Sequence, residues 1–198
     1  AIMYVDNSSK ALTEEVGPQI QASQKVIIKI RGANVSVHNI VIYDDITTIN
    51  NHVQRCNILF SHASGILDSL LKGGVVKDYS DLTGELIEEF QVLPVNKGTP
   101  GERHIINASA KTRDLKATMD ALTAMKIKSL QNGGFTPADK ALFMNTFKEY
   151  DVLTVQTVTI LGKLTSWISM MQQNYAVRIH NVLKQSIGMF IFVGIMAV

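Results

Sequence analysis

Two side chains with metal-binding chemistry lie four residues apart, at His52 and Cys56. A helix places such positions on one face, and an imidazole with a thiolate is a typical half of a zinc site. The other half is missing, because Cys56 is the single cysteine and the remaining histidines lie in unrelated contexts. A small apolar residue is also what a helix core needs at this position. The sequence therefore predicts no metal site and no cofactor.

A second possible chemistry is hydrolysis, with Ser61 as nucleophile, His62 as base and Asp44 or Asp45 as the orienting carboxylate. No G-x-S-x-G elbow, H-E-x-x-H motif or phosphate-binding glycine loop frames these residues. An aspartate that precedes an apolar periodic run is better explained as a helix cap. We therefore expect a non-enzymatic protein, and an enzyme without a recognisable motif remains as an alternative.

A third candidate is a group of carboxylates that could supply an acid/base pair. The segment after Gly74 predicts a short helix that has Tyr79, Leu82, Leu86 and Phe90 on its apolar side. Its opposite side then carries Asp78, Asp81, Glu85, Glu88 and Glu89. Neighbouring carboxylates on an exposed helix face are usually solvated, so we expect a polar surface here.

The overall composition limits the kinds of partner. Charged residues make up 18% of the chain and hydrophobic residues 46%, whereas roughly 25% charged residues is usual in soluble domains. A net charge of +2 is too small for a protein that neutralises many phosphates, so we expect no nucleic acid as partner. The shortage of charge indicates that something other than water covers part of the surface.

The charges are distributed very unevenly along the chain. No Asp or Glu occurs from Val152 to Val198, whereas fixed positive charges occur at Lys163, Arg178 and Lys184. The stretch from Gln185 to Val198 is uncharged and largely apolar. Anionic headgroups attract cations, and apolar side chains enter the lipid layer beside them. Residues 185–198 are therefore predicted to be a C-terminal membrane-associating segment.

The expected membrane contacts comprise an interfacial aromatic residue, two cations and the apolar side chains of the tail, namely Trp167, Arg178, Lys184, Ile187, Met189, Phe190, Ile191, Phe192, Val193, Ile195 and Met196. As a helix the tail would reach about 21 Å, less than the roughly 30 Å of a hydrocarbon layer. It could be a static anchor, part of a longer span, a segment that inserts after assembly, or the buried last helix of an oligomer. Trp167 could equally be a large core residue of the bundle.

Long helices must position these groups. A run with alternating spacings of three and four predicts a helix that packs through Ile46, Ile49, Val53, Cys56, Phe60, Leu67 and Leu70. Asp44 or Asp45 caps its start, and Gly73–Gly74 ends it. A further helix is expected over residues 109–131. A last one begins at Thr136–Pro137, and Gly162 and Gly188 are its expected bends.

Two β-hairpins are expected, over residues 25–43 and 91–106, because apolar β-branched residues flank turn-forming ones. For the first segment, a helix that runs through Val35 and Ile42 is the rival interpretation. The predicted fold class is mainly α, an elongated helical bundle over residues 1–184 with long heptad-patterned helices and one or two short hairpins.

The function expected from these features is that of a non-enzymatic, membrane-associated assembly subunit, anchored through its cationic and apolar C-terminal helix. Its partners would be a lipid membrane and further protein chains, identical or different, bound through helix seams. The alternative is a pore-forming or membrane-lytic protein that oligomerises and inserts, because the expected architecture resembles the helical pore-forming toxins at the level of the fold alone. Membrane association is the expected location, in an extracytoplasmic or secreted setting or another compartment.

Overall fold

The computed structural model describes residues 9–80 and 84–196, with side chains for residues 9–10, 13–80 and 84–185. Four long helices and one two-stranded antiparallel sheet form this part of the chain, which confirms the predicted fold class. In chain order the elements are η1 (Ala11–Val16, a π-helix), α2 (Gly17–Ile42), α3 (Ile46–Lys72), β1 (Gly74–Tyr79), β2 (Leu86–Val92), α4 (Pro100–Gln131) and α5 (Pro137–Met196).

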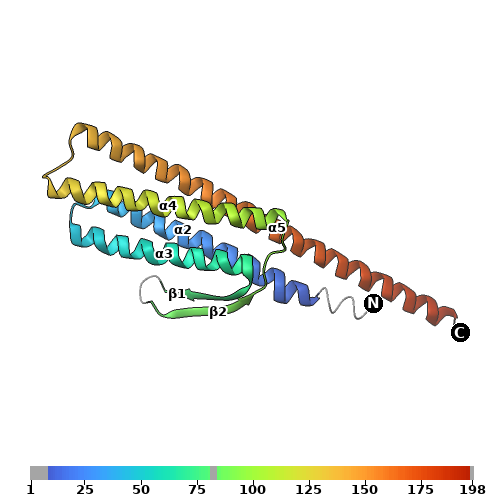
Figure 1. The fold of residues 1–198 in the computed structure, drawn as a ribbon. Helices are drawn as coiled ribbons and strands as arrows, with labels where there is room; N and C mark the ends of the chain where they lie inside the picture. The colour runs from blue at the N-terminus through green and yellow to red at the C-terminus, as the bar shows by residue number, and fades with distance from the viewer. Residues whose placement is uncertain (1–8, 81–83, 197–198) are drawn as a thin grey trace.

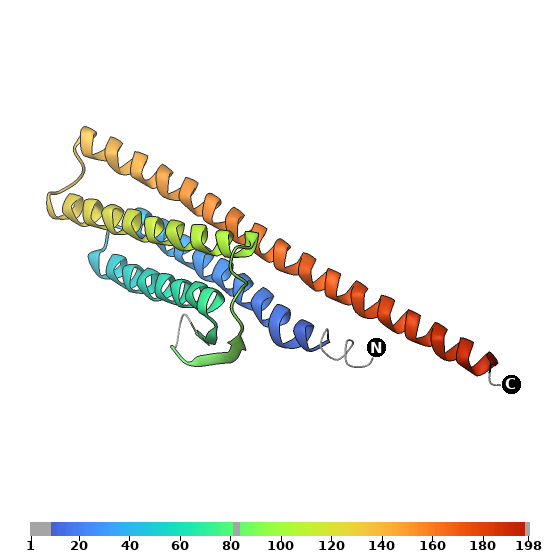
Figure 2. The same ribbon diagram turned by 45° about the vertical axis from the view of Figure 1, so that its right-hand side comes forward.

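The four long helices lie side by side, and each reverses the direction of the one before it (Figure 1). Helix α2 contacts α3 and α5, and α4 also contacts α3 and α5, so the four helices enclose one core. The sheet lies outside the bundle, against α2 and α3 (Figures 1 and 2). Helix α5 continues well beyond the other helices at the end where η1 lies against it.

The hairpin predicted over residues 25–43 is wrong, because this segment belongs to α2. Its rival, a helix through Val35 and Ile42, is the observed structure, although a break at residues 43–45 separates α2 from α3. The buried side chains of α2 repeat at spacings of four and three, as in Val26, Ile30, Ala33, Val37 and Ile40. Packing of this stripe outweighs the preference of β-branched residues for strands.

The hairpin of the structure lies where a short helix was predicted, over residues 74–92. Gly73 and Gly74 have positive φ angles of 77° and 138°, which only glycine adopts easily, and they turn the chain from α3 into β1. Strand alternation then directs Val76, Asp78 and Val92 inward. The acidic side chains are therefore divided between two faces of a sheet and do not line one side of a helix.

The second predicted hairpin, over residues 91–106, is also wrong beyond Val92, because α4 begins at Pro100 and not near residue 109. Thr99 and Glu102 form a capping box, in which the Glu102 N–H donates to Thr99 Oγ1 and the Gly98 N–H donates to Glu102 Oε2. With Pro100 at the first helical position, this motif starts the helix nine residues earlier than the apolar pattern suggested.

The starts of α3 and α5 have the caps that the sequence predicted. The Thr48 N–H donates to Asp45 Oδ2 at 2.7 Å, and the Asp139 N–H donates to Thr136 Oγ1 at 3.1 Å. Helix α5 continues without interruption through both Gly162 and Gly188, where bends were expected. Of the predicted packing residues of α3, the buried ones are Ile49, Cys56, Phe60, Leu67 and Leu70; Val53 is half-buried, and Ile46 is exposed because it lies in the first turn.

Buried ion pairs attach the hairpin to α2. Lys25 Nζ lies 2.5 Å from Asp78 Oδ2 and 3.0 Å from Glu88 Oε2, and Lys29 Nζ lies 2.9 Å from Asp78 Oδ1. Gln21 also donates to Glu88 Oε1. Burial by itself raises the pKa of Asp78, but the hydrogen bonds and charges of Lys25 and Lys29 outweigh it and leave the pKa below its ordinary value of 3.8. Asp78 is therefore ionised at neutral pH.

Replacement of Asp78 by Asn should destabilise the fold by about 3 kcal/mol, because two largely buried ammonium groups lose their carboxylate partner. Chemical denaturation at pH 7 measures this difference. Since the pKa of Asp78 is lowered on folding, its contribution is complete above the ordinary pKa of 3.8 and disappears as the pH falls through the lowered value. The variant and the unmodified protein should therefore converge in stability only in strong acid.

The matched control is Glu89→Gln on the outer face of the same hairpin, where Glu89 forms an exposed ion pair with Lys77 at 3.4 Å. Exposed pairs contribute little, so this variant should lie within about 0.5 kcal/mol of the unmodified protein. An equal loss in both variants would mean that the inward ion pairs have no special role.

Candidate functional site: the projecting segment of helix α5

The side chains with possible metal chemistry have different surroundings. Cys56 is buried in the core, where its Sγ lies 3.6 Å from the Ala33 carbonyl oxygen. Burial raises the pKa of the Cys56 thiol to about 12. The His52 ring stacks on Tyr43, with ring centroids 5.8 Å apart. Among the described residues no group of three or more His, Cys, Asp or Glu side chains is arranged to hold a metal ion.

The residues of the hydrolase hypothesis are divided between the turn before α3 and the middle of α3. Asp45 caps the first turn, and its hydrogen bonds with Thr48 lower the pKa of the Asp45 carboxyl group. Asp44 Oδ1 lies 2.7 Å from the buried Lys126 Nζ, which also donates to the Val41 carbonyl at the end of α2. His62 contacts the Tyr79 ring about four turns further along. The structure therefore does not bring Asp44 or Asp45 to Ser61–His62.

The carboxylates of the third candidate are also occupied. Asp78 and Glu88 pair with lysines of α2, and Glu89 pairs with Lys77 across the two strands. Glu85 also takes part in an interaction, and Asp81 lies outside the described residues. Sequence reasoning missed the buried role of Asp78, which the period-two pattern of residues 74–79 could have indicated.

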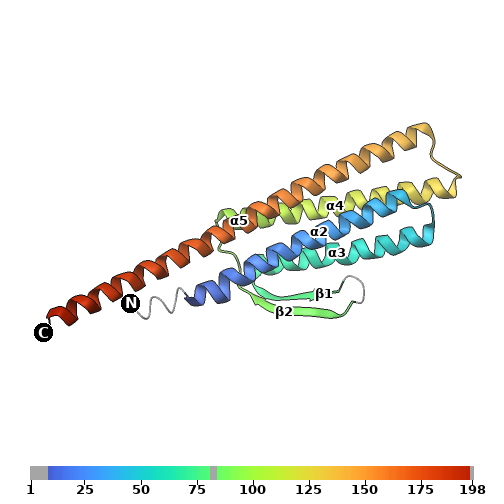
Figure 3. The same cartoon turned by 180° about the vertical axis from the view of Figure 1, so that it is seen from behind.

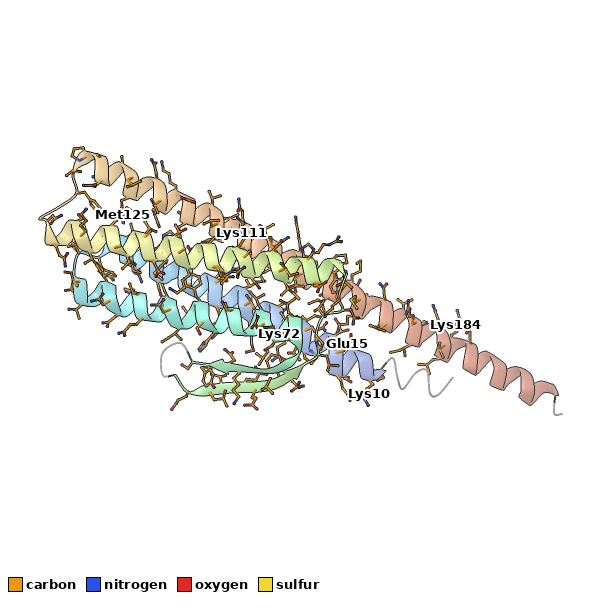
Figure 4. All side chains as sticks on the ribbon, viewed as in Figure 1. Lys10, Glu15, Lys72, Lys111, Met125 and Lys184 are labelled. Carbon is orange, nitrogen blue, oxygen red and sulfur yellow. The ribbon has the colours of Figure 1, made fainter. Side chains whose placement is uncertain are left out.

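A hollow of about 240 Å³ lies at the opposite end of the bundle, beside the turn between α4 and α5. Met125, labelled in Figure 4, is part of its wall. The carboxylate in the wall, Asp139, accepts a hydrogen bond from Thr136 as part of the helix cap. The polar groups of this hollow therefore serve the helix end.

The far end of α5 extends past the start of α4. The Trp167 indole packs against Gly101, in the first turn of α4, so closely that a Cβ atom on Gly101 would lie 2.2 Å from the ring. Helix α4 begins one residue earlier, at Pro100. Beyond Trp167, helix α5 therefore has no α4 beside it. We call residues 169–196 the projecting segment; at ~1.5 Å per residue it is about 42 Å long.

The surface of the projecting segment differs from that of the bundle. Ile168 is the last buried residue of α5 among the side chains described, which extend to residue 185. Met170, Val177 and Leu183 are exposed aliphatic side chains beyond it. Figure 4 shows Lys184 on the part of α5 that lies beyond the other helices. Tyr175 packs against the core and η1 contacts α5, so the segment is partly covered near its base. Apolar side chains that stay exposed beyond the core are typical of an interaction surface.

A cationic hollow lies near the base of the projecting segment. Met171, Asn174, Tyr175 and Arg178 occupy one helix face and line a volume of about 140 Å³. Arg178 forms no ion pair within the described part of the chain, and no acid follows it in the sequence. An unpaired guanidinium beside a phenol and an amide forms a set of hydrogen-bonding groups that suits an anionic oxygen ligand.

The predicted membrane contacts are placed as follows. Arg178 and Lys184 lie exposed on the projecting segment, whereas Trp167 is half-buried between α5 and α4. The backbone helix includes Ile187, Met189, Phe190, Ile191, Phe192, Val193, Ile195 and Met196, and the side chains of these residues lie outside the described part. In the part of the chain that the structure describes, no helix has the length and apolar character needed to cross a membrane.

No protein-family model matches this chain, and comparisons with curated proteins and with solved structures found no similar protein.

The contact between Gly101 and Trp167 is testable by enlarging the glycine. Gly101→Ala should destabilise the fold by about 1–3 kcal/mol, because the new methyl group overlaps the indole ring and must displace it. The matched control is Gly65→Ala in α3, where no atom lies within 4 Å of the new Cβ. That change should stabilise the helix by up to about 1 kcal/mol. Equal effects of the two changes in thermal unfolding would contradict the close contact.

The environment of Cys56 predicts a protected thiol. Because its pKa is raised to about 12, the thiol stays protonated at pH 8, and the thiolate that reacts with disulfide reagents is scarce. Labelling should be at least 100-fold slower in the native protein than in denaturant, as a colorimetric thiol assay can measure. Rapid labelling of the folded protein would mean that α2 and α3 separate readily.

Proposed function

We propose that this chain is a non-enzymatic helical-bundle subunit that associates with membranes through the projecting segment of α5. The observation that carries this proposal is that α5 continues for about 42 Å beyond Ile168, in a stretch of sequence without acids whose described side chains are all exposed or half-buried. Tyr175 packs against the core and η1 contacts α5, but no side chain described beyond Ile168 is fully buried. The surplus length therefore serves contact with something outside the bundle.

A lipid surface fits this segment better than water or nucleic acid does. Arg178 and Lys184 provide uncompensated positive charge, and the exposed aliphatic side chains lie between and beside them. Each basic residue near an anionic leaflet contributes about 1 kcal/mol. The hollow beside Arg178 offers donors for the phosphate oxygens of a headgroup. The apolar tail then enters the layer beyond the headgroups.

The absence of a catalytic role belongs to the same proposal. The residues that suggested chemistry are used as caps, ion pairs and core residues, as in Asp45, Asp78 and Cys56. These uses account for the presence of each residue without a substrate. A helical scaffold with one uncovered end is suited to binding and assembly.

The test is flotation of the purified protein with vesicles of phosphatidylcholine alone or mixed with phosphatidylglycerol, each containing an entrapped dye. The protein should float with the anionic vesicles, more weakly with the neutral ones, and without release of the dye. Phe190→Asp/Phe192→Asp should lower the partition coefficient at least 100-fold, because two aromatic side chains each lose about 1.5–3 kcal/mol of burial. Circular dichroism should show unchanged helix content.

The matched control is Ile58→Asp/Ile106→Asp, which adds the same two charges at exposed aliphatic positions of α3 and α4. It should float like the unmodified protein. Equal flotation of all three proteins would contradict the proposed role of the tail. Loss of helix content in the Phe190/Phe192 variant would place the segment in a core. Release of the dye would favour a membrane-lytic protein.

A further inference from the structure

A second exposed apolar surface lies on the bundle itself, along α2 and α5. Ile28, Val35 and Ile42 follow each other on α2 at intervals of seven residues, and α5 adds Val152 and Val155. These five side chains are between 55% and 69% exposed. An interval of seven residues keeps side chains on one face of a helix, as in the seam of a coiled coil. This surface is independent of the projecting segment.

Two contacts between the helices fix the relative positions of these side chains. Ser23 Oγ lies 2.9 Å from Thr165 Oγ1, and His38 Nε2 lies 3.0 Å from Asp151 Oδ1. The helices are antiparallel, so each step back along α2 matches a step forward along α5. By this register Val35 lies at the level of Val155, and Arg31 lies near the level of residue 158. The exposed aliphatic residues thus lie on the outer side of the packed helices α2 and α5. Figure 3 shows these two helices side by side. We call this side the α2–α5 face.

We propose that the α2–α5 face is the interface through which two copies of this chain form an antiparallel dimer. The aliphatic row is symmetric about Val35, because Ile28 and Ile42 lie seven residues to either side. A twofold axis that runs across both helices at the level of Val35 and Val155 therefore packs α2 on α2 and α5 on α5 in antiparallel order, and it brings the apolar residues of the two copies together. Interfaces of this twofold kind use one patch on both subunits and must be self-complementary.

The charges beside the row favour the antiparallel arrangement. Arg31 is exposed and forms no ion pair within the residues described. Arg31 lies four residues before Val35 on α2, and Asp151 lies four residues before Val155 on α5. Because α2 and α5 are antiparallel, these offsets run in opposite directions along the bundle, and the twofold axis brings Arg31 and the Asp151 of the other copy to the same level. Arg31 of one copy therefore meets Asp151 of the second copy. A parallel pair would instead set Arg31 against Arg31, which is unfavourable.

The size of the surface sets the expected strength. From Met144 to Gly162 the α2–α5 face is about 27 Å long, and two helices are about 20 Å wide. The footprint is therefore on the order of 500 Å² per copy, below the roughly 800 Å² of a standard stable interface. We expect a dissociation constant in the micromolar range and a monomer–dimer equilibrium that dilution shifts.

Sedimentation equilibrium in lipid-free buffer at pH 8, from about 1 to 200 μM protein, tests the dimer. This range covers the micromolar dissociation constant expected for a small interface. The average mass should rise from 21.8 kDa towards twice this value. Val35→Asp should remain monomeric throughout, because two buried carboxylates would lie near the twofold axis. Arg31→Asp should weaken the dimer at least tenfold, and Arg31→Asp/Asp151→Arg should restore it, because the swap recreates the pair in both places.

The control for surface polarity is Ile58→Asp on α3, which should dimerise like the unmodified protein. A constant monomer mass for the unmodified protein at all concentrations overturns the proposal, and so does dimerisation of Val35→Asp. Failure of the double swap to restore a dimer that Arg31→Asp weakened overturns the antiparallel register. Because the assay contains no lipid, its result does not depend on the proposed membrane function.

Discussion

The packing of the Trp167 indole on Gly101 sets the boundary on which the rest of the molecule depends. It aligns the first turn of α4 with one level of α5, and the core ends at Ile168 directly beyond that level. No other residue than glycine allows this approach without displacing the ring. Up to this level α5 is part of a packed four-helix bundle. Beyond it α5 has no α4 beside it, although η1 contacts α5 and Tyr175 packs against the core. The end of the four-helix packing is thus marked by a single close contact.

Two buried lysines, each paired with a carboxylate, fix the positions of elements that helix packing alone leaves undefined. Lys29 and Lys126 are both buried, and each meets a carboxylate and a backbone carbonyl. The first of these pairs holds the hairpin against α2, and the second closes the end of α2 against α4. Buried ion pairs are weak sources of net stability, but they penalise every arrangement that separates the partners. Their contribution here is the unique position of the hairpin and of the α2–α3 turn.

Sequence reasoning succeeded where a local signal and the tertiary packing agree. The seam of α3, its cap at Asp45 and the start of α5 at Thr136 are such cases. It failed for α2 because β-branched residues hid a helical spacing that only burial reveals, and for residues 74–92 because helical and strand periods both fitted a short run. The acid-free end of α5 could be read directly from composition. The level at which α5 extends past α4 could not be predicted, because Gly101 and Trp167 are 66 positions apart in the sequence and no local pattern links them. The wrong prediction of a hairpin over residues 25–43 also hid the exposed apolar row of α2, which we propose as a dimer surface.

The two proposals together restrict how the protein meets a membrane. A twofold axis perpendicular to α2 and α5 directs the projecting segments of the two copies to opposite ends of the dimer. Each segment is about 42 Å long and points away from the other, so the two cannot enter one flat bilayer together. A dimer either joins two membranes or holds one segment away from lipid, whereas a monomer does neither. Under the two proposals, self-association and membrane binding are linked by geometry, although separate surfaces carry them.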